Sequence, residues 1–265
     1  MEHPEVTELY KYRSFSGRNL SMLENNQLYF AASFTFNDPF DCRARKEFEF
    51  GDDEELIEKM APLEAAHQGI SSDQAVEYLN HIIANNRKDE YLNEKSNLFQ
   101  KLVLEQFGIC SFSEVSNDIL MWSHYSDGHQ GFCLQFERSP ENLLQSARPV
   151  EYPDNDEFPY VEYWRQNPNA QLEEFARIVT TKSQHWRYEK EWRALDRPGQ
   201  VDTHYKGHVS TYSGTVLKGV VFGVRMPSEK RQVIKKIVAG KNVDLYEAKI
   251  VRNRFQIEVV PETNE

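Results

Sequence analysis

Two glutamates late in the chain, Glu189 and Glu191, have the spacing that best suits acid and base chemistry. They lie in the run 186–195, whose alternating pattern predicts a strand with Glu189, Glu191 and Arg193 on one face. Like charges this close resist joint ionisation, so burial would raise the pKa of one glutamate. One carboxylate can then stabilise positive charge while the other handles a proton. The alternative is an exposed strand edge, where Arg193 and Lys190 pair with the carboxylates at little energetic gain.

The stretch 116–137 is the second candidate, because it is dense in aromatic and imidazole side chains. Strand-like runs at 108–113 and 131–136 enclose a short helix, for which Ser116 or Asn117 is the expected N-cap and Gly128 the expected end. Four side chains in it can stack on a flat ring or carry a proton: Trp122, His124, Tyr125 and His129. We interpret this stretch as one wall of a site, with Tyr10 and Tyr12 as further rings.

A metal site is an alternative use of the two histidines. His124 and His129 are five residues apart, which differs from the i,i+4 pair of a zinc helix. Together with Asp38 and Asp41 from an earlier loop, they would suit a metal-dependent hydrolase or nuclease, and Asp127 lies between them in the sequence. The other interpretation is that the histidines fix the loop 128–131 by hydrogen bonds, and we expect no metal.

Composition narrows the class of protein. The 265 residues carry a formal net charge of −11, which argues against sequence-independent coating of nucleic acid. A local basic cleft stays open, although solvated basic faces are the plainer interpretation. Its candidates are Arg43, Arg45, Lys46, Lys230, Arg231, Lys235, Lys236, Arg252 and Arg254. No P-loop or G-x-G-x-x-G follows a predicted strand.

Three features that the sequence lacks predict its cellular compartment. Its three cysteines fit neither a disulfide framework nor a zinc-finger spacing. We find no secretory signal at the N-terminus and no apolar run long enough to span a bilayer. The expectation is therefore a cytoplasmic protein without a membrane partner.

The elements that must position these residues form an α+β pattern. Strands are predicted at 9–14, 28–32, 217–224, 245–248 and 255–260, and helices at 19–23, 172–185 and 227–238. Residues 52–107 have helical periodicity throughout and hold no group of residues with a catalytic pattern. We therefore expect one α+β domain, 1–265, with a helical insertion at 52–107.

Five blocks together resemble a bacterial family of unknown function that is linked to phage defence. They are LYKYRS, FNDPFD, SFSE, MWSHYSDGHQGFC and WRYEKEWR, and they extend from about residue 9 to residue 195. The resemblance implies a defence role and a possible antitoxin or other defence partner, but no mechanism.

A second, weaker resemblance does imply a mechanism. The order Tyr12-Arg13-Ser14, then Asn19-Leu20, is similar to the opening of ADP-ribosyltransferases of the DNA-targeting toxin type, and Glu189-Lys190-Glu191 is similar to their Glu-x-Glu element. The resemblance implies a split, mostly antiparallel sheet and NAD as the substrate. The residues that it places around NAD are Tyr12, Arg13, Ser14, Asn19, Trp122 and Tyr125. Tyr12 stands where that family has histidine.

The resemblance also implies catalytic roles. Glu191 would stabilise the oxocarbenium-like ribosyl group, Glu189 would orient an acceptor that is nucleic acid or protein, and Trp122 or Tyr125 would sandwich the nicotinamide. With His124 added, these glutamates and Tyr125 are the candidate catalytic residues. Three hypotheses therefore stand: an NAD-dependent ADP-ribosyltransferase-like enzyme, the metal-dependent hydrolase, and a non-catalytic sensor or binding module.

Overall fold

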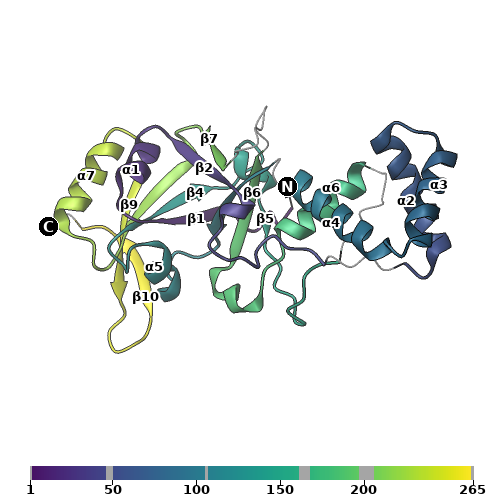
Figure 1. The fold of residues 1–265 in the computed structure, drawn as a ribbon. Coiled ribbons are helices and arrows are strands. Elements are labelled where there is room, and N and C mark those ends of the chain that lie inside the picture. Colours follow the sequence, from purple (N-terminus) through teal and green to yellow (C-terminus); the bar gives the residue numbers. More distant parts are fainter. Residues whose placement is uncertain (1, 46–49, 105–106, 161–167, 197–205, 264–265) are drawn as a thin grey trace.

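The fold is that of a mixed α/β protein built on one large sheet (Figure 1). The computed structural model describes residues 2–45, 50–104, 107–160, 168–196 and 206–263. Within them the sheet has ten strands, and the order along its main path is β10-β9-β8-β4-β1-β3-β2-β7. Nearly all neighbouring strands are antiparallel, and β8 and β9 run parallel through a helical crossover. The predicted α+β class with a mostly antiparallel sheet is confirmed.

The strands are short and follow the apolar pattern of the sequence. Their bounds are β1 Glu8–Arg13, β2 Gln27–Ala32, β3 Gly108–Ser113, β4 Phe132–Glu137, β5 Arg148–Pro149, β6 Glu191–Asp196, β7 Gly207–Thr211, β8 Leu217–Phe222, β9 Asp244–Ile250 and β10 Ile257–Pro261. In β2 every second residue is buried, as a strand with one core face requires. β8 is buried almost throughout, because it lies between β4 and β9.

The sheet splits along one edge of β3. One edge of β3 pairs along its whole length with β6. The other edge is shared, since β1 meets it at Ser113 and β2 meets it at Ile109 and Gly108. β1 and β2 therefore diverge along β3 and leave a gap in the sheet between them.

The helices lie around the sheet and at one end of the molecule (Figure 1). Their bounds are α1 Gly17–Glu24, α2 Asp53–Gln68, α3 Ser72–Ala84, α4 Lys88–Leu104, α5 Ile119–Tyr125, α6 Pro168–Val179 and α7 Ser228–Val238. Three 3-10 turns add η1 Ser33–Thr35, η2 Leu143–Ser146 and η3 Gln184–Glu189. α5 packs beside β1 and η3, so it closes one side of the split.

The segment between β2 and β3 is helical and has an apolar core of its own. α2 and α3 pack together around Leu56, Met60 and Leu79, and Tyr91 of α4 joins them. In Figure 1 these helices lie away from the sheet, at the opposite end from α7. The main core instead fills the faces of the sheet around Phe132, Phe136 and Phe222 and is separate from the helical one. Helices occur within 52–107 as the sequence predicted, whereas the helix predicted at 172–185 ends at Val179. The division into one domain with an insertion stays a prediction.

Gly131 ties the start of β4 to the end of β1. A Cβ atom at this position would lie 2.1 Å from the carbonyl oxygen of Arg13, which no side chain tolerates. The Oγ of the buried Ser126 donates to the same carbonyl at 3.3 Å. The turn after α5 is therefore held directly against the strand that forms one wall of the split.

Candidate functional site

A pocket occupies the split between β1 and β2. β1, β2 and β3 supply its floor and walls, and η3, α5 and the loop after β2 supply its rim. Among the residues that line it are Tyr12, Arg13, Tyr125, Glu189 and Glu191, five of the candidates from the sequence. These residues are far apart in the chain, and the fold brings them to one cavity of about 230 Å³.

Glu189 and Glu191 reach the pocket by a different route from the one expected. Residues 186–189 belong to η3 rather than to a strand, and Lys190 adopts a left-handed conformation with φ of 42° before β6 begins at Glu191. The prediction of one alternating strand over 186–195 is therefore wrong in its first half, because Lys190 breaks the repeat. The two carboxylates nevertheless converge, since both accept a hydrogen bond from Lys182.

Five buried side chains form what we call the Lys182 cluster: Asp41, Lys182, Glu189, Glu191 and Arg193. The Nζ atom of Lys182 lies 2.6 Å from Glu189 Oε2, 3.0 Å from Glu191 Oε2 and 3.8 Å from Asp41 Oδ2. Arg193 donates through Nη1 and Nη2 to the two oxygens of Asp41 at 2.8 and 2.7 Å. It also donates to both oxygens of Glu191, at 2.8 and 3.0 Å.

The cluster shifts the pKa values of its two glutamates in opposite directions. Burial raises the pKa of Glu191, but the charges of Arg193 and Lys182 outweigh that effect and hold the pKa at about 2. For Glu189 burial prevails over the attraction of Lys182, and the charge of Glu191 adds to it, so its pKa is raised. Glu191 is thus a fixed anion, whereas burial makes Glu189 the carboxylate of the pair that more readily takes up a proton.

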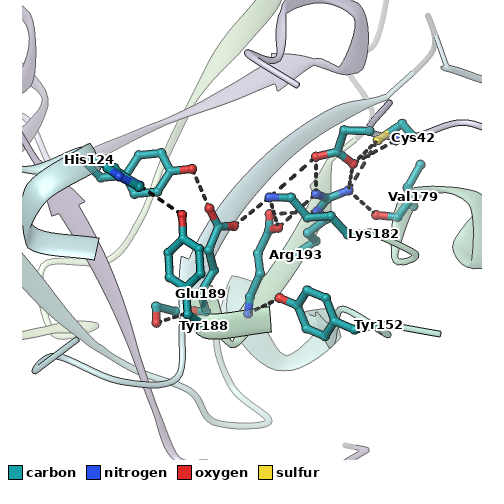
Figure 2. Close-up of polar contacts among 12 residues, drawn as sticks. Cys42, His124, Tyr152, Val179, Lys182, Tyr188, Glu189 and Arg193 are labelled. Carbon is teal, nitrogen blue, oxygen red and sulfur yellow. Dashed lines mark hydrogen bonds and ion pairs between the residues drawn. The ribbon is translucent and has the colours of Figure 1, made fainter. Parts of the chain in front are cut away.

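Tyr125 completes the environment of Glu189. Its hydroxyl donates to Glu189 Oε1 at 2.5 Å, while Lys182 occupies the other oxygen. Burial and the charge of Glu189 raise the pKa of this tyrosine. His124 lies beside it, exposed, with Nδ1 3.0 Å from the hydroxyl of Tyr188. Figure 2 shows this row of contacts from His124 past Glu189 and Lys182 to Arg193.

The local structure of α5 differs from the prediction at both ends, since the helix ends at Tyr125 with Ser126 as its C-cap rather than at Gly128. Asp118, rather than Ser116 or Asn117, caps the helix, and its Oδ1 accepts from the backbone N–H groups of Leu120 and Met121. Gly128 is left-handed as predicted, and Asp127 and His129 on either side of it also have positive φ. Three such residues in a row reverse the chain sharply and lead it into β4.

Trp122 belongs to the core. It is fully buried, donates from Nε1 to the carbonyl of Ser116 at 2.9 Å and packs edge-on against Tyr12. A side chain with no exposed surface has no face for a ligand, so of Trp122 and Tyr125 it is Tyr125 that lines the pocket. Tyr12 is mostly buried as well, and its hydroxyl donates to the carbonyl of Val115.

The motif near the N-terminus contributes one residue to the pocket and two to the turn beside it. Arg13 lines the pocket, and Ser14 and Asn19 are not among the lining residues. Asn19 instead donates from Nδ2 to the carbonyl and hydroxyl oxygens of Ser14, at 2.9 and 3.2 Å. That bond fixes the turn from β1 into α1 and so positions Arg13.

The residues proposed for a metal do not converge. Asp41 is bound to Arg193, Asp38 accepts from the backbone of Phe40, and His129 lies 3.0 Å from the hydroxyl of Ser123. In the part of the chain that the structure describes, no three His, Cys, Asp or Glu side chains are grouped so that they could hold a metal ion. The hydrolase hypothesis therefore gains nothing from the geometry.

None of the basic-run residues that the structure describes lines the pocket. Arg231 of α7 pairs with Glu247 of β9, and Lys235 of α7 pairs with Glu262. Both basic side chains therefore have structural roles. Arg252 and Arg254 are exposed on the β9–β10 turn. Lys46 lies outside the described residues.

Sequence reasoning missed the two lysines of the pocket. Lys182 follows α6 in a segment with no recognisable motif, and Lys11 seemed only to be part of a strand. Both line the pocket. The sequence does not distinguish these two lysines, because the role of a lysine depends on the carboxylates or the cavity beside it. Only the tertiary fold brings those neighbours to it.

A comparison with family models gave a match over the centre of the site. A family model described as "Protein of unknown function (DUF2971)" matches residues 121–194. The match runs from α5 to β6 and so includes Tyr125, Lys182 and both glutamates. Comparisons with the curated proteins and with the solved structures gave no match.

One negative finding concerns membranes. Among the described residues no helix combines the length and the apolar character needed to cross a bilayer.

Proposed function

We propose that the protein is an NAD-using, ADP-ribosyltransferase-like enzyme that works as a defence effector or toxin on nucleic acid or protein. The observation that carries the proposal is the meeting of Tyr12, Tyr125, Glu189 and Glu191 in one pocket at the split of the sheet. The sequence resemblance puts these residues at one NAD site, and the pocket gathers them from segments more than 170 residues apart.

The reaction needs negative charge beside a ribose. Breaking the bond between ribose and nicotinamide builds positive charge on the sugar, so a fixed anion stabilises the transition state more than the ground state. The Lys182 cluster contains three carboxylates against two cations. When Glu189 ionises, the cluster itself therefore carries one excess negative charge.

This charge balance refines the roles of the two glutamates. Both oxygens of Glu191 already accept from Arg193 or Lys182, so we assign to it the task of holding Lys182 in place. Glu189 has Tyr125 on one oxygen and a shared lysine on the other. We assign to Glu189 the contact with the ribosyl group or the proton of the acceptor, and to Tyr125 the nicotinamide ring.

Incubation with labelled NAD and mixed acceptors tests the proposal. We expect nicotinamide release, ADP-ribosyl transfer, or both. The variant Glu189→Gln should lower the rate about 10²-fold or more, because a positioned proton-transfer group contributes that much. Glu58→Gln, on the exposed side of α2, is the matched control and should keep the full rate.

Two results would overturn the proposal. One is a folded protein that neither releases nicotinamide nor transfers ADP-ribose with any acceptor, including after addition of its defence partners. The other is an unchanged rate in Glu189→Gln. Tight NAD binding without turnover would favour the sensor or binding-module hypothesis instead.

A further inference from the structure

Lys11 is a buried amine that faces the pocket without a counter-ion. It lies in the middle of β1, and 7% of its surface is exposed. Its Nζ donates to the carbonyl oxygen of Ser111 and lies 4.8 Å from the centre of the Phe112 ring. Among the described residues no carboxylate pairs with it, whereas Lys182 has three around it.

This environment favours the neutral amine. Burial lowers the pKa of Lys11 to about 8, and the charge of Arg13 acts in the same direction. The titratable groups that oppose this are Cys110 on β3 and Glu191 on β6. At pH 7 about one in ten such amines is unprotonated, against fewer than about one in a thousand for an ordinary lysine. Desolvation beside a second cation is a known way to make lysine a nucleophile.

Arg13 is that second cation, and it provides an anion site next to the amine. It follows Lys11 by two residues on the same strand, so both side chains leave the same face of β1. It also lines the pocket, and in the described part of the chain it forms no ion pair. A guanidinium binds carboxylate and phosphate groups through paired hydrogen bonds.

We propose that Lys11 forms an imine with the carbonyl carbon of a small anionic aldehyde whose carboxylate or phosphate is held by Arg13. The nitrogen lone pair attacks the carbonyl carbon, the oxygen takes up a proton, and the resulting carbinolamine loses water to give the imine. No oxidant or reductant is needed, and hydrolysis reverses the step. An open-chain ribose 5-phosphate unit is one aldehyde of this class. The proposal does not rest on the NAD chemistry.

Reductive trapping tests it on the full-length protein. Glyoxylate and glycolaldehyde phosphate supply the carboxylate and phosphate arms, glycolaldehyde is the uncharged control, and cyanoborohydride reduces the imine to a stable secondary amine. Peptide mass spectrometry then gives the rate at each lysine. At pH 7 we expect either anionic aldehyde to label Lys11 about tenfold faster than the exposed Lys236. The rate at Lys11 should rise with pH and level off above about 8.

Two variants separate the parts of the site. Arg13→Gln should slow labelling of Lys11 by the anionic aldehydes about tenfold more than labelling by glycolaldehyde, because only the anionic aldehydes lose a charge-assisted contact. Glycolaldehyde labelling should slow only slightly, since the pKa of Lys11 rises when the charge of Arg13 is removed. Arg252→Gln on the β9–β10 turn is the matched control and should change neither. The proposal is wrong if Lys11 in the unmodified protein reacts no faster than Lys236, or if Arg13→Gln leaves the anionic rates unchanged.

Discussion

Two buried glutamates in this protein have nearly the same neighbours and different properties. Glu64 in the helices between β2 and β3 accepts from Tyr91 at 2.6 Å, lies 2.6 Å from Lys95 and accepts from Gln68 on its second oxygen. Glu189 accepts from Tyr125 at 2.5 Å and from Lys182 at 2.6 Å. Each is thus a carboxylate held by one tyrosine and one lysine.

The difference lies in how the lysine is shared. Among the described residues Lys95 pairs with one carboxylate, whereas Lys182 also lies near Glu191 and Asp41. Burial raises the pKa of both glutamates, but for Glu64 the bonds from Lys95 and Tyr91 prevail and the pKa is lowered. For Glu189 burial prevails. Glu64 is a structural ion pair, and Glu189, which lines the pocket, has the properties of a proton carrier.

Replacing each glutamate by glutamine should show the largest difference between the two sites. We expect Glu189→Gln to reduce NAD cleavage by about 10²- to 10⁴-fold with little loss of stability. Glu64→Gln should keep the activity and lower the free energy of unfolding by about 1–3 kcal/mol, because it weakens a buried charged contact. Nicotinamide release and urea unfolding measured on the same preparations would show it. Equal activity loss in the two variants would contradict the distinction.

Arg193 should be the residue on which the pocket region depends most for stability. It is fully buried and holds two carboxylates, Asp41 and Glu191, from opposite sides of the cluster. Arg193→Met would leave both anions without their main partner, so we expect a loss of about 3–5 kcal/mol in urea unfolding. Arg87→Met, which removes an exposed pair with Glu90, should lower the free energy of unfolding far less, because solvent screens that pair. Similar losses in both variants would count against the cluster.

The pH dependence of stability should have opposite signs at the two glutamates. The lowered pKa of Glu64 contributes stability above its unfolded pKa, which is lost as the pH falls below about 4.5. The raised pKa of Glu189 contributes stability below the unfolded pKa, which is lost as the pH rises through the folded value. From pH 4 to pH 7, Glu64→Gln should therefore become less stable relative to the parent protein, and Glu189→Gln more stable. Parallel curves would show that the two sites do not differ.

The tyrosines should give the smallest difference. Tyr91→Phe removes one hydrogen bond to Glu64 and should lower the free energy of unfolding by about 0.5–1.5 kcal/mol without affecting activity. Tyr125→Phe keeps the ring and loses the bond to Glu189, so it should shift the pH profile of NAD cleavage as well. An identical pH profile in Tyr125→Phe would show that this hydroxyl does not influence the working carboxylate.

Much of the architecture could be predicted from sequence periodicity. β1, β2, β8 and α7 lie where their apolar spacing placed them, because each buries one face or a whole strand. The prediction failed at Lys190, where a single left-handed residue separates η3 from β6. A repeat of two residues looks the same whether it continues as a strand or stops, so the sequence alone did not show the break.

Only part of the candidate site could be predicted from the sequence, for a related reason. Tyr125, Glu189 and Glu191 stood out by type and spacing, and all three line the pocket. Asp41 was considered only as a ligand of an alternative metal site, because its partner Arg193 lies 152 residues away in the chain. Lys182 and Lys11 were missed, since nothing local distinguishes a lysine that faces a buried pocket from one that faces water.

A crystal structure with a non-cleavable NAD analogue would test the central claim most directly. We expect the ribose that carries the nicotinamide to contact Glu189, with the nicotinamide ring against Tyr125 inside the split between β1 and β2. An analogue bound elsewhere on a protein that cleaves NAD would contradict the assignment of this pocket as the active site.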